Sequence, residues 1–149
     1  MQYINKWMMV VVLVFAGLLL SGCHHEDHGH HMEHPSHVEH IEGSDVSKVI
    51  LTEMAIKRTD VLTDEVREQK VSRHTSPRKV VPYSSIWYDY HGDVWVYTVP
   101  EPRTFIRHKI DVDYIEGNTV VLNDGPPVGT IIASQGVAEI YGSEFEVGH

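Results

Sequence analysis

The chain has 149 residues, of which 42% are hydrophobic, and a formal net charge of −9 at pH 7 with neutral histidines. A chain this acidic repels the phosphates of nucleic acids, so we expect no nucleic-acid partner. Cys23 is the only cysteine, which excludes an intrachain disulfide.

The first 22 residues have the pattern of a signal peptide. Lys6 supplies a positive start, and residues 7–20 are apolar or small throughout. Such a run is too short for a comfortable transmembrane helix and is typical of a signal-peptide core. It leads into Leu-Ser-Gly before Cys23, which resembles the lipobox of bacterial lipoproteins. An uncleaved anchor helix with an incidental cysteine is the alternative.

The lipobox resemblance implies cleavage before Cys23, a covalent lipid on this residue, and a chain anchored in the cell envelope that faces the periplasm. More than one acyl chain would make the anchor durable, because each buried CH₂ contributes about 0.8 kcal/mol. His24 follows the cysteine, where an Asp would hold a lipoprotein at the inner membrane. The resemblance therefore favours the outer membrane in a two-membrane cell.

A histidine-rich tract follows Cys23 directly, with Glu and Asp residues between the histidines. Neutral imidazole is a good ligand for Zn²⁺, Cu²⁺ and Ni²⁺, and carboxylates can complete the coordination shell. Gly29 and Pro35 interrupt any helix, so we expect a disordered tract that binds divalent metal ions at several exchangeable places. The predicted ligands are His24, His25, His28, His30, His31, His34, His37 and His40.

Two other interpretations of the tract remain open. A flexible coil from Cys23 to Asp45 would span on the order of 25 Å and would lift a folded domain off a lipid surface. The tract would also gain positive charge in mild acid, because the reference pKa of histidine is about 6.5. The same protonation would release bound metal, since only the neutral ring coordinates.

From Asp45 onward the composition is that of a globular domain built from short strands and Gly or Pro turns. This pattern predicts a mainly β fold, a small antiparallel roll or barrel-like domain with one or two short helices. The sequence thus divides into a signal peptide (1–22), a lipidated His-rich disordered tether (23–44) and a β domain (45–149). The expected elements are strands at 46–51, within 61–72, and at 79–88, 94–99, 104–114, 119–122 and 131–134, with helices at 53–57 and 137–141.

The aromatic residues of the domain are predicted to lie in the core or to form cross-strand pairs, with an aromatic ligand platform as the alternative. They are Trp87, Trp95, Tyr97 and Phe105. His91 stands in a turn between Asp89 and Asp93. It is expected to be a solvated turn residue, with a surface metal site as the alternative.

Residues 80–97 read V-V-P-Y-S-S-I-W-Y-D-Y-H-G-D-V-W-V-Y. This run resembles the pattern V-P-x-S-A-V-x-x-x-x-G-x-x-W-V-Y of the periplasmic adaptor subunits of RND-type efflux pumps, also called membrane fusion proteins. Other stretches similar to these adaptors stand in the same order at 50–61, 105–112, 117–122, 124–130 and 135–142. The resemblance implies a membrane-proximal β-roll whose role in the family is contact with an inner-membrane transporter.

Typical adaptors also carry a lipoyl-like domain, an α-helical hairpin and a β-barrel domain. No segment of the 149 residues resembles these parts, so we do not expect this chain to bridge two membranes by itself.

The function we expect is that of an accessory lipoprotein in an RND-type, heavy-metal efflux system. Its expected partners are the RND transporter or a full-length adaptor subunit. The alternative is a structural or interaction module, or a remnant of a longer adaptor, in which the tract is only a tether. The sequence contains no nucleophile elbow, H-E-x-x-H, P-loop or dinucleotide fingerprint, so we expect no enzymatic activity.

Overall fold

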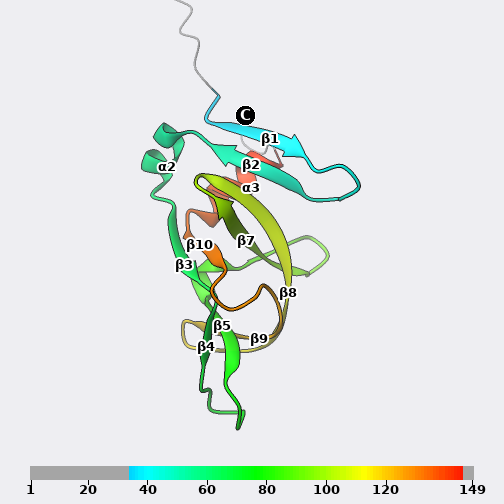
Figure 1. Cartoon of the computed structure of the whole chain (residues 1–149), viewed down its shortest axis with the longest axis vertical. Coiled ribbons are helices and arrows are strands. Elements are labelled where there is room, and N and C mark those ends of the chain that lie inside the picture. The colour runs from blue at the N-terminus through cyan, green and yellow to red at the C-terminus, as the bar shows by residue number, and fades with distance from the viewer. Residues whose placement is uncertain (1–33, 146–149) are drawn as a thin grey trace, which may run out of the picture. The chain divides into compact units, whose positions relative to one another are not determined.

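The computed structural model describes residues 34–145, and this part of the chain is mainly β, as the sequence predicts. Figure 1 shows the elements in order. They are β1 (Ser36–His40), β2 (Ser47–Leu51), α2 (Glu53–Thr59), β3 (Leu62–Glu65), β4 (Arg67–Gln69), β5 (Arg78–Pro82), the 3₁₀ turn η1 (Tyr83–Ser85), β6 (Trp87–Tyr88), β7 (Val94–Glu101), β8 (Thr104–Glu116), β9 (Thr119–Asp124), β10 (Ile131–Gln135) and α3 (Val137–Glu144). Between residues 34 and 145, no helix has the length and apolar character that a membrane crossing requires.

The order of strands and helices predicted from Asp45 onward is confirmed, although several elements end later than predicted. The strand expected over 79–88 is broken by η1, the strand expected to end at Val99 continues through Pro100 to Glu101, and the last helical turn extends to Glu144. Thr52 caps α2, because the backbone N–H of Ala55 donates to Thr52 Oγ1 at 3.1 Å.

The prediction of disorder up to residue 44 is wrong for its last part. Ser36–His40 forms β1, which pairs antiparallel with β2, and Val38 lies directly opposite the fully buried Val49. Tertiary pairing with a buried strand therefore orders a segment whose own composition is too polar to predict a strand.

The strands form one antiparallel sheet in the order β3-β10-β7-β8-β9-β5-β4, onto which β2, β1 and β6 also pair. Although β3 and β4 stand at opposite ends of this order, only Val66 separates them in the chain. The N–H of Val66 donates to Thr130 O at 2.9 Å, and its carbonyl accepts from Gly129 N at 2.8 Å. The continuous segment from β3 through Val66 to β4 therefore contributes a strand to each edge of the sheet, and the sheet curls into a half-barrel.

The long strand β8 gives the sheet its curvature. Its first part pairs with β7 and β2, and its last part pairs with β9. Register shifts between Asp111 and Val112, and between Val112 and Tyr114, mark β-bulges at the change of partner. Because a bulge bends its strand and increases the local twist, one strand serves both halves of the sheet, as its arc in Figure 1 shows.

The central strands bury side chains on both faces. On β7, Val96 packs in one cluster with Ile110, Leu122 and Ile132. The next residue, Tyr97, packs in a second cluster together with residues of β2, α2 and α3. Since successive side chains on a strand point to opposite faces, the half-barrel has one core inside its curve and another beneath the two helices.

The predicted aromatic core is confirmed. Tyr97 and Phe105 have exposed fractions of 0% and 2%. Trp87 and Trp95 are directly opposite each other on β6 and β7, and their ring centroids lie 6.0 Å apart. They form the predicted cross-strand pair.

Candidate functional site

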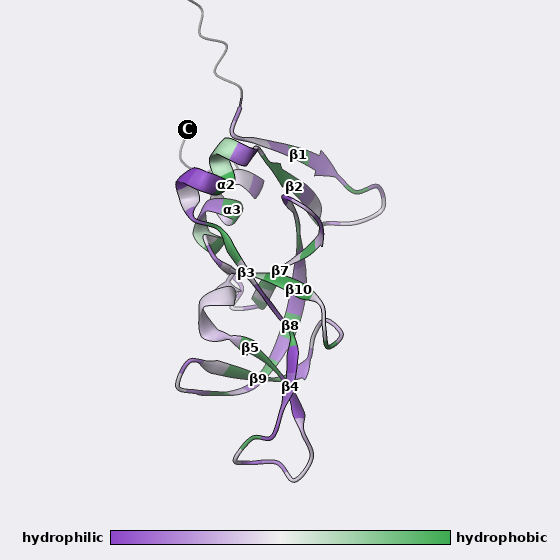
Figure 2. Ribbon diagram, turned by 60° about the vertical axis from the view of Figure 1, so that its left-hand side comes forward, coloured by the Kyte–Doolittle hydropathy of each residue, from purple (hydrophilic) through white to green (hydrophobic). Residues whose placement is uncertain are grey.

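The predicted metal-binding tract lies only in part within the described residues. The lipidation residue and five of the predicted ligands lie outside them; these are Cys23, His24, His25, His28, His30 and His31. The remaining three predicted ligands, His34, His37 and His40, are all exposed. Figure 2 shows that β1 is predominantly hydrophilic where it lies beside β2.

The pairing of β1 with β2 fixes the directions of these side chains. Val38 shares a face with the buried Val49, so His40, two positions on, lies on that face as well. His37 and Glu39 lie on the opposite, outer face, where His37 Nε2 is 3.8 Å from Glu39 Oε1. His37 and His40 therefore do not converge on one ion. Within the part of the chain that the structure describes, no group of three or more His, Cys, Asp or Glu side chains could hold a metal ion.

An open aromatic pocket of about 370 Å³ lies on another part of the domain. Trp87 is central to its wall, with Trp95 and Tyr97 stacked near it and Tyr141 approaching its edge at a centroid distance of 4.9 Å. Its indole N–H is buried and has no hydrogen-bond acceptor among residues 34–145. The residues that line the pocket are Asp45, Trp87, Asp89, Tyr90, His91, Asp93, Trp95, Arg107, Tyr141 and Phe145.

The turn between β6 and β7 is organised by Asp89. Its carboxylate accepts hydrogen bonds from the backbone N–H groups of His91 and Asp93 and from the indole N–H of Trp95, at 2.9, 2.9 and 3.0 Å. Desolvation acts to raise the pKa of Asp89, but these hydrogen bonds outweigh it and hold the pKa below its usual value of 3.8. Asp93 pairs with Lys109 at 2.7 Å. With both carboxylates engaged, the expected role of His91 as a solvated turn residue fits better than a metal site.

In the lining of the pocket, Arg107 contacts three segments. Its Nε lies 3.1 Å from Glu144 Oε1, and its guanidinium donates to the backbone carbonyl of Asp45. The guanidinium carbon also lies 4.9 Å from the Trp95 ring centroid, a cation–π contact. Arg107 thereby connects β8 to the β1–β2 turn, to α3 and to β7.

Glu144 is the buried acid of this network. Its Oε2 accepts a hydrogen bond of 2.7 Å from the hydroxyl of Tyr97, and its side chain is only 2% exposed. Burial raises the pKa of Glu144, although the hydrogen bond from Tyr97 and the charge of Arg107 act in the opposite direction. Burial, together with the neighbouring carboxylate, also raises the pKa of Tyr97. Sequence reasoning missed this network, because β8 and α3 are far apart in the chain and no motif marks either residue.

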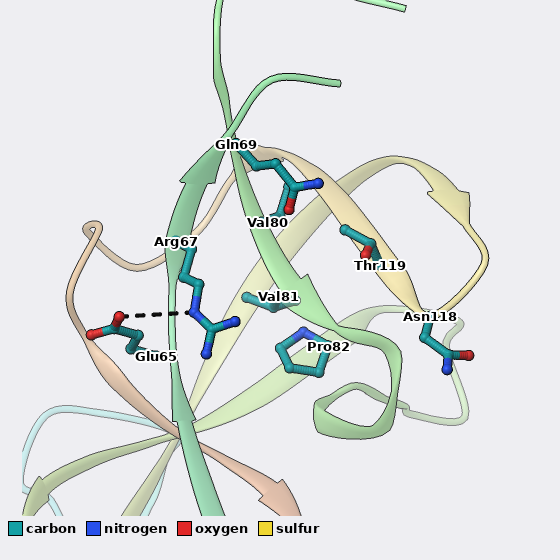
Figure 3. Close-up of a pocket in the computed structure, with 8 residues that line it drawn as sticks. All are labelled: Glu65, Arg67, Gln69, Val80, Val81, Pro82, Asn118 and Thr119. Carbon is teal, nitrogen blue, oxygen red and sulfur yellow. Dashed lines mark ion pairs between the residues drawn. The ribbon is translucent and has the colours of Figure 1, made fainter. Parts of the chain in front are cut away.

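A smaller, more polar pocket of about 200 Å³ lies between β4, β5 and the turn before β9. Figure 3 shows Arg67 between Glu65 on one side and the apolar Val81 and Pro82 on the other, with Arg67 Nε and Glu65 Oε1 3.8 Å apart. Arg67 also pairs with Asp64. Exposed ion pairs of this kind contribute at most about 1 kcal/mol to stability. The aromatic pocket is larger and is lined by several aromatic rings, so it is the stronger candidate for binding.

The comparisons with known proteins found nothing: no protein-family model, no curated protein and no solved structure matches the chain. The adaptor resemblance of residues 80–97 and the stretches around it therefore remains a prediction from sequence.

Proposed function

We propose that this protein is an envelope lipoprotein that captures divalent transition metal on its His-rich tract and serves an RND-type efflux system as an adaptor-like accessory. Cys23 carries the lipid, and the tract leads from the membrane to the β domain. The domain is the part that meets the transporter or a full-length adaptor subunit.

The observation that carries this proposal is the exposure of the tract where it enters the domain. His34, His37 and His40 all present their imidazoles to solvent, and β1 continues directly into the folded core through β2. A ligand-bearing segment joined to a folded module without an intervening linker keeps its metal next to whatever the module contacts. Zn²⁺, Cu²⁺ and Ni²⁺ are the ions that imidazole and carboxylate ligands favour.

Metal titration tests the proposal. The chain is titrated calorimetrically with Zn²⁺, Cu²⁺ and Ni²⁺, and compared with a variant in which all eight tract histidines, from His24 to His40, are changed to Ser. The matched control changes three histidines outside the tract, His74, His91 and His108, to Ser. We expect binding at micromolar metal to be lost in the tract variant and kept in the control. Equal binding by both variants would reject the metal function.

A second candidate function, an interaction module that uses the tract only as a tether, is favoured by the aromatic pocket. Trp87, Asp89 and Trp95 of that pocket belong to the adaptor-like run 80–97, and Tyr90 at its rim is 92% exposed. Exposed aromatic side chains over a pocket are typical of protein contacts. In this case, recovery of an RND transporter subunit from membranes should survive the eight His→Ser changes and should fall with Tyr90→Ser. Tyr83→Ser, at a site 47% exposed outside this pocket, is the control.

A further inference from the structure

The outer edge of β1 is unpaired within the described part of the chain. β1 pairs with β2 alone, and Figure 1 shows no labelled element beyond it. The carbonyl of Pro35 accepts from Thr52 N at 3.0 Å, while Leu51 N donates to Arg103 O on the other side of β2. Since backbone groups alternate along an antiparallel pair, His37 and Glu39 bond toward β2, and Ser36, Val38 and His40 direct their N–H and C=O groups to the open edge.

We propose that two copies of this chain pair antiparallel along their β1 edges and bind one divalent transition-metal ion between them. This inference rests on the proposed metal-binding function and gives it a defined site. Its ligands are His37 and Glu39 of each copy, two imidazoles and two carboxylates.

The register follows from the direction of the backbone groups and from charge. A two-fold axis at Val38 makes Val38 a hydrogen-bonded pair with its equivalent, and Ser36 a hydrogen-bonded pair with His40 of the second copy. His37 then stands opposite Glu39 of the second copy in a non-hydrogen-bonded pair. An axis at Glu39 would instead oppose two carboxylates, which is unfavourable for cross-strand neighbours.

The same register brings four metal ligands to one face. Cα atoms of a non-hydrogen-bonded pair lie about 4.5 Å apart, and residues i and i+2 of one strand about 6.8 Å apart. Four side chains at the corners of such a rectangle can reach one ion held at about 2.0–2.2 Å from each ligand atom in tetrahedral geometry. One ligand pair already converges in the single chain, where His37 Nε2 and Glu39 Oε1 are 3.8 Å apart. Lys48 occupies the other oxygen, Oε2, at 3.3 Å.

Dimerisation through β1 should depend on the bound metal ion. Each β1 strand has five residues, so its edge contact is small compared with the roughly 1,000 Å² of a specific interface. The strands alone should therefore associate weakly, and a shared ion that binds only the paired state should shift the equilibrium toward the dimer.

Light scattering coupled to gel filtration of the full chain in detergent, with EDTA or with Zn²⁺, tests this inference. We expect monomers in EDTA and dimers in Zn²⁺. His37→Gln and Glu39→Gln should each raise the Zn²⁺ concentration needed for dimers by about 10–100-fold or more, since each removes two of the four ligands. The exchange variant His37→Glu with Glu39→His retains the ligand set and should dimerise. The control Ser36→Ala changes the other face of the same strand and should have no effect.

A fifth variant separates this site from the rest of the tract. It changes His24, His25, His28, His30, His31 and His34 to Ser and keeps His37 and Glu39. We expect it to lose most Zn²⁺ binding but still to form dimers with one ion per two chains. Monomers in Zn²⁺ for this variant, or wild-type dimerisation by His37→Gln, would overturn the shared site. If the six changes leave total Zn²⁺ binding unaltered, the broader metal function of the tract fails while the shared site stands.

Discussion

Gly136 is the position where a single added methyl group should disturb the domain most. It precedes α3 in the left-handed region, with φ of +74°, and a Cβ there would lie 2.6 Å from Val61 Cγ2, 3.1 Å from Val61 Cα and 3.2 Å from Thr59 O. The left-handed conformation costs an alanine about 1–2 kcal/mol, and overpacking costs about 1–3 kcal/mol. The smaller conformational entropy of unfolded alanine offsets about 0.4–1 kcal/mol. Gly136→Ala should therefore lower the free energy of unfolding by about 1–4.6 kcal/mol, or about 3 kcal/mol at the middle of these ranges.

Urea unfolding followed by tryptophan fluorescence measures this loss, because Trp87 packs against Tyr141 of α3. Gly43→Ala is the matched control. Its φ is +76°, but a Cβ there meets nothing within 4 Å, so it should lose only about 1 kcal/mol. Adding Val61→Ala to Gly136→Ala removes the Cγ2 overlap and should make the double variant more stable than the two separate losses predict. If Gly136→Ala were no more destabilising than Gly43→Ala, the steric part of the reasoning would be refuted.

Two predictions concern titrating groups near the pocket. Because the folded pKa of Glu144 is raised above 4.5, its contribution to stability is present below that pH and is lost as pH rises through the folded pKa. The stability of the wild type relative to Glu144→Gln should therefore fall over this window in thermal unfolding at a series of pH values, and a constant difference would contradict the assignment. Because the pKa of Asp89 is lowered, its contribution is present above 3.8 and is lost as pH falls through the folded pKa. Asp89→Asn keeps an oxygen for the two backbone donors but not for Trp95, so its melting temperature near neutral pH should lie between those of the wild type and Asp89→Ala; equal values for the two variants would exclude a role for the turn hydrogen bonds.

The sequence predicts most of this fold, because its signals are local. Thr52 caps α2, the turn at Asp89 returns Trp95 onto Trp87, and the glycine turn after Glu116 joins β8 to β9. The disorder predicted for β1 was wrong because Val38 is the only apolar residue in that strand, and its partner Val49 supplies the burial that orders it. The hydrophobic pattern of one segment does not show burial that a neighbouring strand provides.

The aromatic pocket was not predictable for a related reason. The pairing of its two tryptophans could be predicted from the turn between them. The ion pair of Arg107 with Glu144 could not, because it joins a strand and a helix that no local sequence pattern connects. From the sequence alone, Arg107 and Glu144 would each be predicted to be an exposed surface charge. Only the curvature of β8 and the placement of α3 bring them together and bury the carboxylate.

Arg107 contacts segments that belong to both candidate sites. It donates to Asp45 O in the connection that leads from β1 to β2, and its guanidinium carbon lies 4.9 Å from the Trp95 ring centroid. Holding that connection favours the pairing of β1 with β2, and this pairing places His37 and Glu39 together on the outer face. Because a guanidinium makes directional contacts in several directions at once, a lysine at this position would keep the charge but not the geometry. The ordered end of the tract and the aromatic pocket thus share the contacts of one side chain, Arg107, with Asp45 and with Trp95.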